Sequence, residues 1–265
     1  MLEVGWFSTG RGEGSLGLFE HVYRRMHSGE IDARIQFVFS NREPGEGEGS
    51  DRFFQRVKSY GLPLVTVSSM KFRREVGGRF TEHREEYDRR VMDALHGFEP
   101  DVCALAGYML IMSDAMCRRY TMLNLHPALP GGSVGTWQDV IWDLIDSRAT
   151  FTGSMVHLAT EELDRGPVVA YCTLPIVGGL FDELWTEIAG RALEDLKAES
   201  GEELPLFKLI RQEGYRREPW LLGATLKAIA EGRTTLQGGR VYDREGMPST
   251  GLCLDEEVER ALSGS

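Results

Sequence analysis

Short apolar runs and longer amphipathic segments alternate along the first part of the chain. The apolar runs have the length and the near-continuous hydrophobic character of buried parallel strands, and they lie at residues 2–8, 35–40, 62–67 and 102–106. The longer segments place apolar residues three or four positions apart, as a helix does, and they lie at residues 16–26, 51–60 and 80–96. This alternation predicts an α/β fold of right-handed βαβ units, with a mostly parallel twisted sheet and helices on both faces.

The second half of the chain follows a different pattern. Residues 152–159 alternate polar and apolar positions, and residues 168–176 are expected to be their antiparallel partner. Helices are expected at residues 137–145, 180–196, 206–210 and 220–231, followed by a hairpin at 234–242. Residues 70–78 are expected to form a loop, and the acidic tail from Asp255 is expected to pack weakly or fray. We expect an α/β domain over residues 1–223 and a C-terminal helix and hairpin extension, residues 224–265, packed on it.

Composition limits the classes of protein to consider. The formal net charge of -11 argues against binding to nucleic acid or to an anionic membrane surface. We find no apolar run long enough to span a membrane and no basic, apolar leader at the N-terminus, so a cytoplasmic location is expected. The four cysteines lie far apart without a CxxC pair, which argues against a zinc cluster or a disulfide framework. No metal site is expected.

Residues 123–130, Leu-Asn-Leu-His-Pro-Ala-Leu-Pro, are the most informative stretch of the chain. Strand alternation puts Leu123 and Leu125 on one face, and Asn124 and His126 on the other. The two prolines end the strand because proline has no N–H for a sheet ladder. Ligands bind at the carboxyl ends of strands in open α/β sheets, so an amide and an imidazole are expected at a binding site. The plain alternative is a polar strand end that happens to contain a histidine.

A glycine-rich loop follows the first strand and precedes a helix. Such a loop can hold a phosphate with backbone N–H groups and with the positive end of the helix dipole. Its candidate substrate-binding residues are Gly10, Arg11, Gly12, Glu13, Gly14 and Ser15. Glu13 would oppose an anion, and the spacing is not that of a P-loop. A nicotinamide oxidoreductase is disfavoured because the final glycine spacing of the dinucleotide fingerprint is missing, and no acidic residue ends the second strand.

Three segments carry an ordered set of family signatures. Residues 101–109 are similar to a strand that leads into a folate pocket, and residues 124–130 to the signature Asn-Ile-His-Pro-Ser-Leu-Leu-Pro. Residues 152–157, followed by 161–167, are similar to a second signature. Together they resemble the glycinamide ribonucleotide formyltransferase family, over most of residues 1–176 and more loosely to about residue 245.

This resemblance implies a formyltransferase-like fold, 10-formyltetrahydrofolate as cosubstrate, and a small, phosphorylated amine as the second substrate. It implies catalytic roles for Asn124, His126 and Asp164. The folate-contacting residues that it implies are Tyr108, Met109, Leu110, Ile111, Thr160, Glu161, Glu162 and Leu163. It adds Arg84 and Pro127 to the substrate-binding set. Both a monomer and a homodimer stay open.

The chemistry explains these residue types. When an amine attacks a formyl carbon, negative charge develops on the oxygen, and an amide N–H from Asn124 could stabilise it. His126 could donate a second hydrogen bond or carry the proton of the amine to the leaving group. Asp164 would hold the imidazole and favour its protonated form.

Departures from the family pattern leave the acceptor open. The glycine loop contains Glu13, Met109-Leu110-Ile111 stands where relatives often have Met-Arg-Ile, and Trp137 lies in a loop where relatives often carry histidine. Residues 194–211 resemble an insertion. Glycinamide ribonucleotide is the leading acceptor. The alternatives are another amine, for example an amino sugar, and a folate- or phosphate-binding relative without activity. His157 could line the pocket or be a structural histidine.

Overall fold

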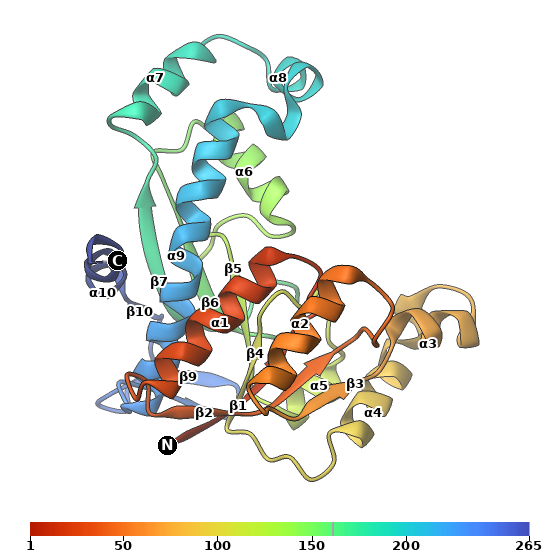
Figure 1. Cartoon of the computed structure of the whole chain (residues 1–265). Coiled ribbons are helices and arrows are strands. Elements are labelled where there is room, and N and C mark those ends of the chain that lie inside the picture. Colours follow the sequence, from red (N-terminus) through yellow and green to blue (C-terminus); the bar gives the residue numbers. More distant parts are fainter. Residues whose placement is uncertain (161, 265) are drawn as a thin grey trace.

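A large mixed sheet organises the molecule. The computed structural model describes residues 1–160 and 162–264. Within them, an eight-stranded sheet has the order β10-β7-β6-β5-β4-β1-β2-β3, and β8 and β9 form a separate hairpin (Figure 1). The strands are β1 (Leu2–Phe7), β2 (Ala33–Ser40), β3 (Leu64–Thr66), β4 (Val102–Leu105), β5 (Met122–His126), β6 (Phe151–Leu158), β7 (Val168–Pro175), β8 (Thr234–Gln237), β9 (Arg240–Asp243) and β10 (Leu252–Cys253).

The strand directions match the expectation from the sequence. β1 pairs in parallel with β2 and β4, β2 with β3, β4 with β5, and β10 with β7. β6 pairs antiparallel with both β5 and β7. The mostly parallel sheet with an antiparallel pair toward the C-terminal half is therefore confirmed.

Helices cover both faces of the sheet. They are α1 (Glu13–His27), α2 (Glu48–Ser59), α3 (Ser69–Val76), α4 (Arg84–Ala94), α5 (Asp114–Arg119), α6 (Trp137–Asp146), α7 (Leu180–Glu187), α8 (Leu193–Glu199), α9 (Pro205–Ala230) and α10 (Asp255–Ser263), with single 3₁₀ turns η1 (Phe80–His83) and η2 (Gly201–Glu203). Buried residues of α1, α2, α9 and α10 form one core cluster with the sheet, and those of α3, α4 and α5 form another. Successive residues of β4 alternate between the two clusters, as a strand buried on both faces must.

A third cluster extends the molecule beyond the end of β7. Buried residues of α6, α7, α8 and the first half of α9 pack together there. These helices gather at the top of Figure 1, above the sheet. The prediction of one helix over residues 180–196 was wrong, because a non-helical segment separates α7 from α8. Gly190 has a φ of 76° there, a conformation that an α-helix does not contain.

Residues 70–78 are not the predicted loop, because most of them belong to α3. The hydroxyl of Ser68 caps this helix and accepts a hydrogen bond of 3.0 Å from the backbone N–H of Lys71. Phe72 is buried in the second core cluster and anchors the helix. A cap and one buried aromatic residue thus overcome a basic, polar composition.

The helices predicted at residues 206–210 and 220–231 form one continuous helix, α9, with Pro219 in its interior. An interior proline costs about 3 kcal/mol. Burial of Leu221, Leu222 and Leu226 outweighs this cost, since each buried leucine contributes about 1.5–3 kcal/mol. α9 also runs through residues 223 and 224, so the division into two domains at this point stays a prediction about independent folding.

The acidic tail is more firmly attached than its composition suggests. Asp255 at the start of α10 accepts hydrogen bonds of 2.6 Å from the backbone N–H of Thr173 and 2.7 Å from its hydroxyl. Val258 is buried against α9 and the sheet. The expectation that the tail packs weakly was therefore wrong. None of the described helices is long and apolar enough to cross a membrane.

Candidate active site

β5 presents two polar side chains on one face at its carboxyl end. Leu123 and Leu125 contact the first core cluster, whereas Met122 belongs to the second, so Asn124 and His126 point away from the two leucines. This confirms the alternation that the sequence predicted. In the antiparallel pairing with β6, Asn124 lies opposite His157.

Asp164 enters the same place from the turn between β6 and β7. Its φ of 53° is in the left-handed region, which aspartate tolerates better than most residues. Gly166 completes the turn, and a side chain there would overlap the backbone carbonyl oxygen of Leu158. The unusual backbone of this turn places the carboxylate against β5, and such outliers are concentrated at functional sites.

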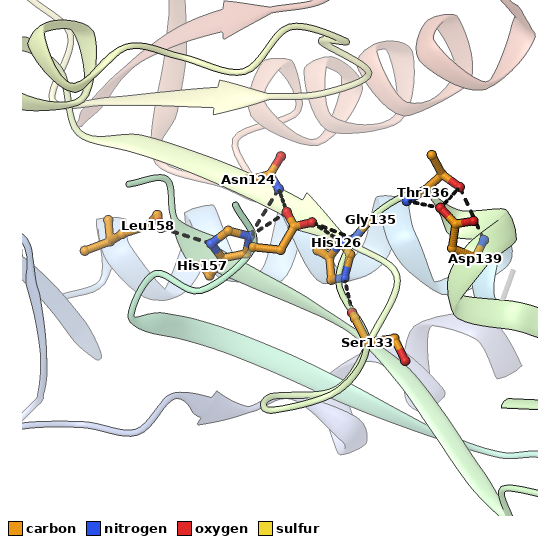
Figure 2. A network of polar contacts seen from close by, with 9 residues as sticks. Asn124, His126, Ser133, Gly135, Thr136, Asp139, His157 and Leu158 are labelled. Atoms are coloured by element: carbon orange, nitrogen blue, oxygen red, sulfur yellow. Dashed lines mark hydrogen bonds and ion pairs between the residues drawn. The ribbon is translucent and has the colours of Figure 1, made fainter. Parts of the chain in front are cut away.

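The four polar side chains form one network, which Figure 2 shows from close by. The amide nitrogen of Asn124 lies 3.1 Å from Oδ1 of Asp164, to which it donates, and 3.1 Å from Nε2 of His157. Nδ1 of His126 lies 3.5 Å from Oδ2 of Asp164. Nδ1 of His157 contacts the carbonyl oxygen of Leu158 at 2.9 Å, so this nitrogen is the donor and Nε2 is free to accept from Asn124. The carboxamide, the imidazole and the carboxylate that the sequence predicted therefore converge.

The loop after β5 closes over this network. The carbonyl oxygen of Ser133 accepts from Nε2 of His126 at 2.8 Å, and the backbone N–H of Gly135 donates to Oδ2 of Asp164 at 3.2 Å. Thr136 then caps α6 in a capping box with Asp139, which fixes where the loop ends (Figure 2). A substrate atom that bonds to Nε2 of His126 must take the place of the Ser133 carbonyl.

Asp164 is buried, and its surroundings hold it ionised. Burial by itself would raise the pKa of Asp164, but the close approach of the His157 and His126 imidazoles and the hydrogen bond from the Gly135 N–H outweigh it and hold the pKa below its usual value. A carboxylate in this state can orient the imidazole of His126 through the 3.5 Å contact to Nδ1, and it can stabilise positive charge that develops on the ring during a proton transfer.

The loops that follow β1 and β4 meet beside the network. Thr9 accepts a hydrogen bond from the backbone N–H of Met109, and its own N–H donates to the Gly107 carbonyl. Gly107 has a φ of 72°, and a methyl group on it would lie only 2.5 Å from the Ser15 hydroxyl. This close approach joins the predicted folate segment to the start of α1.

The predicted phosphate loop forms the start of α1. Gly10 has a φ of 66°, Gly12 is the N-cap without a side-chain bond, and the first turn begins at Glu13. Gly14 and Ser15 follow in that turn, and Arg11 is exposed. The carboxylate of Glu13 lies 3.1 Å from the guanidinium of Arg52 and is 77% exposed. The helix dipole favours an anion here, whereas Glu13 opposes it.

The predicted folate residues lie in two segments that flank the network. Met109, Ile111 and Leu163 expose 64%, 41% and 46% of their surface, so all three offer apolar side chains to a ligand. Tyr108 differs, because its ring packs against Phe7 and its hydroxyl is enclosed.

The remaining predicted contact residues are distributed around the site. Leu110 packs against the second core cluster, and the Thr160 hydroxyl donates to the Glu162 carbonyl. Glu161 lies outside the described residues. Pro127 follows His126 and lines a small cavity, whereas Arg84 begins α4 next to the buried Asp88. Among the described residues, no hydrogen bond or ion pair joins Arg84 to the network, so its role stays a prediction.

Sequence reasoning undervalued His157 and missed the backbone groups of Ser133 and Gly135. The position of His157 opposite Asn124 depends on the β5–β6 register, which the sequence does not reveal. Over the described chain, no group of three or more His, Cys, Asp or Glu residues is arranged to hold a metal ion.

Comparison with known proteins identifies the family of this chain. A family model described as formyl transferase matches residues 11–185. The chain belongs to the formyl transferase family. The Escherichia coli phosphoribosylglycinamide formyltransferase is 30% identical over 156 residues, which cover 57% of this chain and 64% of that protein. The Haemophilus influenzae protein of the same name is 26% identical over 230 residues, which cover 85% of this chain and 88% of that protein.

This formyl transferase family member shares its fold with solved structures of phosphoribosylglycinamide formyltransferases and of formyltetrahydrofolate deformylases. A phosphoribosylglycinamide formyltransferase from Coxiella burnetii has a TM-score of 0.67 at 19% identity, covering 95% of this chain and 98% of that one. A formyltetrahydrofolate deformylase from Pseudomonas syringae pv. tomato has a TM-score of 0.60 at 21% identity, covering 91% and 65%. At these identities the likeness establishes the fold.

Proposed function

We propose that this protein is an enzyme that transfers the formyl group of 10-formyltetrahydrofolate to a primary amine. The observation that carries the proposal is the convergence of Asn124, His126 and Asp164 at the carboxyl end of β5. An amide donor, an imidazole and an ionised carboxylate are the groups that acyl transfer to an amine requires.

Asn124, His126 and Asp164 would each have a different role in formyl transfer. The Asn124 amide donates to the formyl oxygen as negative charge develops there, in exchange for one of its present acceptors, Asp164 or His157. His126, released from the Ser133 carbonyl, donates a second hydrogen bond or moves the amine proton toward the leaving nitrogen. Asp164 keeps the imidazole oriented and stabilises its positive charge.

The folate-facing residues fit a flat, partly apolar ligand. 10-Formyltetrahydrofolate supplies the formyl carbon when it is bound. The exposed side chains of Met109, Ile111 and Leu163 provide apolar surface, and burial by a ring system would remove it from water. The backbone groups of these segments would provide the few polar contacts that fix orientation.

Different observations support the two candidate acceptor amines. Glycinamide ribonucleotide is supported by the names of the relatives, and the start of α1 could receive its phosphate. Another amine, for example an amino sugar, is supported by Glu13, whose carboxylate stands at the same helix start.

The test follows tetrahydrofolate release by absorbance. The protein is mixed with 10-formyltetrahydrofolate alone, and then with glycinamide ribonucleotide. Release that requires the ribonucleotide supports the leading acceptor, and release that requires a different amine supports the other. Release without any amine indicates hydrolysis, and folate binding without release indicates a binding protein; either of these results contradicts the proposal. His126→Ala should be inactive, while the exposed His96→Ala serves as the matched control.

A further inference from the structure

An open pocket of about 560 Å³ lies between the start of α1, the start of α6 and the first half of α9. Its volume is within the range of small-molecule sites. Its lining includes Glu13, Trp137, Glu202, Lys208, Arg211 and Tyr215. Several of these residues belong to the insertion-like segment 194–211, for which the formyl transfer reaction has no evident use.

One wall of this pocket is a stack of flat groups. The guanidinium of Arg211 lies 4.7 Å from the ring centroid of Trp137 and 5.0 Å from that of Tyr215. Glu218 holds the same guanidinium through a contact of 2.6 Å to Nη1. Phe207 packs beside Trp137, with 5.8 Å between ring centroids. The wall is therefore a fixed aromatic and cationic surface, onto which a planar ring can stack.

The pocket begins close to the reacting groups. The backbone N–H of Gly135 donates to Asp164, and Trp137 is two residues further along the chain. The α-carbons of Gly135 and Trp137 are therefore at most about 8 Å apart. A smaller adjoining cavity is lined by Pro127, Trp137 and Arg211, and Pro127 directly follows His126. A molecule with its amine at His126 could extend along this path to the stacked wall.

The charges of the pocket argue against a phosphate on this wall. It has three carboxylates, Glu13, Glu202 and Glu203, against two cations. Both cations are already ion-paired, Arg211 with Glu218 and Lys208 with Glu203. Glu13 is paired in turn with Arg52, so Glu202 is the lining carboxylate that has no ion pair among the described residues, and its charge favours a neutral or cationic group.

We propose that the acceptor amine carries a planar aromatic ring, which stacks on Trp137, Arg211 and Tyr215, and that segment 194–211 sets this specificity. The inference rests on the proposed formyl transfer. Glycinamide ribonucleotide has no aromatic ring, so it leaves the stacked wall without a partner.

The test uses a matched pair of probe amines, glycinamide and tryptophanamide, which share the same amino-amide head. Calorimetry with tetrahydrofolate present measures their affinity, and tetrahydrofolate release from the formylated cosubstrate measures transfer. Stacking should make tryptophanamide bind about tenfold more tightly than glycinamide. Trp137→Ala and Arg211→Ala should each reduce that preference to about threefold or less, and Trp137→Phe should restore most of it.

A matched control is Arg119→Ala. Its guanidinium also lies over a tyrosine ring, at 4.8 Å from Tyr120, and pairs with a glutamate, Glu99, but it does not line the pocket. This variant should keep the full preference, and thermal melts should show that all variants are folded. Equal affinity for both probes, or a preference that survives Trp137→Ala and Arg211→Ala, overturns the inference. Ring-selective binding without transfer to any amine overturns the proposed function but supports the ring site.

Discussion

Asn124 and His157 face each other across the β5–β6 pair, with the amide nitrogen of Asn124 3.1 Å from Nε2 of His157. His157 is held in turn by the carbonyl oxygen of Leu158 at 2.9 Å. Both N–H groups of Asn124 are therefore directed by neighbours, one by His157 and one by Asp164. When one of these bonds is exchanged for a bond to the formyl oxygen, the other still orients the amide toward the developing oxyanion, which is where electrostatic catalysis gains most.

Asn124→Ala should lower kcat by about 10²–10³-fold, because loss of one oxyanion donor costs about 3–4 kcal/mol in the transition state. Steady-state kinetics and tetrahydrofolate affinity would be measured together. Affinity should change little, since the lost bond forms only as charge develops. A variant with near-normal kcat would remove Asn124 from the mechanism.

His157→Ala tests a positioning role. It should lower kcat about tenfold, because the Asn124 amide loses one of the two partners that orient it. His157→Gln, which can still accept a hydrogen bond, should recover part of the loss. Equal kcat in the Ala and Gln variants, with equal melting temperatures, would indicate that His157 only fills space.

Asp164→Asn tests the carboxylate by activity and by stability. Transfer should fall about 10²-fold or more, since the imidazole loses its charged partner. Because the folded pKa lies below 3.8, the ionised carboxylate contributes stability that is complete above pH 3.8 and declines as the pH falls through the folded value. Urea unfolding of wild type and Asp164→Asn should therefore differ by a constant free energy at pH 5–7, and by less near pH 3. The exposed Asp93→Asn is the control, and a constant difference down to pH 3 would contradict the argument.

The sequence predicted the components of the site better than their connections. The strand pattern placed Asn124 and His126 on one face, and the second signature supplied Asp164. Neither could reveal that His157 supports Asn124, since that depends on the register between two strands. The contacts of Ser133 and Gly135 use backbone groups, which every residue type possesses, so no side-chain pattern signals them.

The fold shows the same division. The βαβ alternation predicted the parallel half of the sheet, because each strand and helix has its own period. The continuity of α9 through Pro219 was missed, because local preference favours a break and distant leucines decide otherwise. The pocket wall was missed as well, because Trp137 and Arg211 are far apart in the chain and meet only when α6 packs on α9.

Two glycine substitutions should have opposite effects on stability. Gly166→Ala should destabilise the fold by about 3 kcal/mol or more, because its methyl group would overlap the Leu158 carbonyl in the turn that carries Asp164. Gly214→Ala lies within α9 with no heavy atom near the added methyl group, and it should stabilise by about 0.5–1 kcal/mol. Urea unfolding midpoints would measure both changes in stability. Destabilisation of similar size in the two variants would contradict the prediction of opposite effects.

The surroundings of His21 predict that the free energy of unfolding depends on pH, independently of catalysis. Its ring packs edge-on against Trp220 at 4.3 Å between centroids, and its Nε2 has no hydrogen-bond partner among the described residues. Burial, followed by the charge of Arg25, lowers the pKa of His21 from 6.5 to about 4. The neutral ring therefore contributes stability that is complete above pH 6.5 and is lost as the pH falls toward 4.

His21→Phe should remove this loss, because phenylalanine keeps the contact with Trp220 and has no proton to bind. Compared with wild type, the variant should gain on the order of 1 kcal/mol between pH 7.5 and pH 5, a value that allows for solvent screening of a half-buried group. Urea unfolding at both pH values measures the gain. His27→Phe, an exposed position on the same helix, should show no such gain. If the His21 and His27 variants behave alike, the pH dependence arises elsewhere, and the ring of His21 is charged in the folded protein without cost.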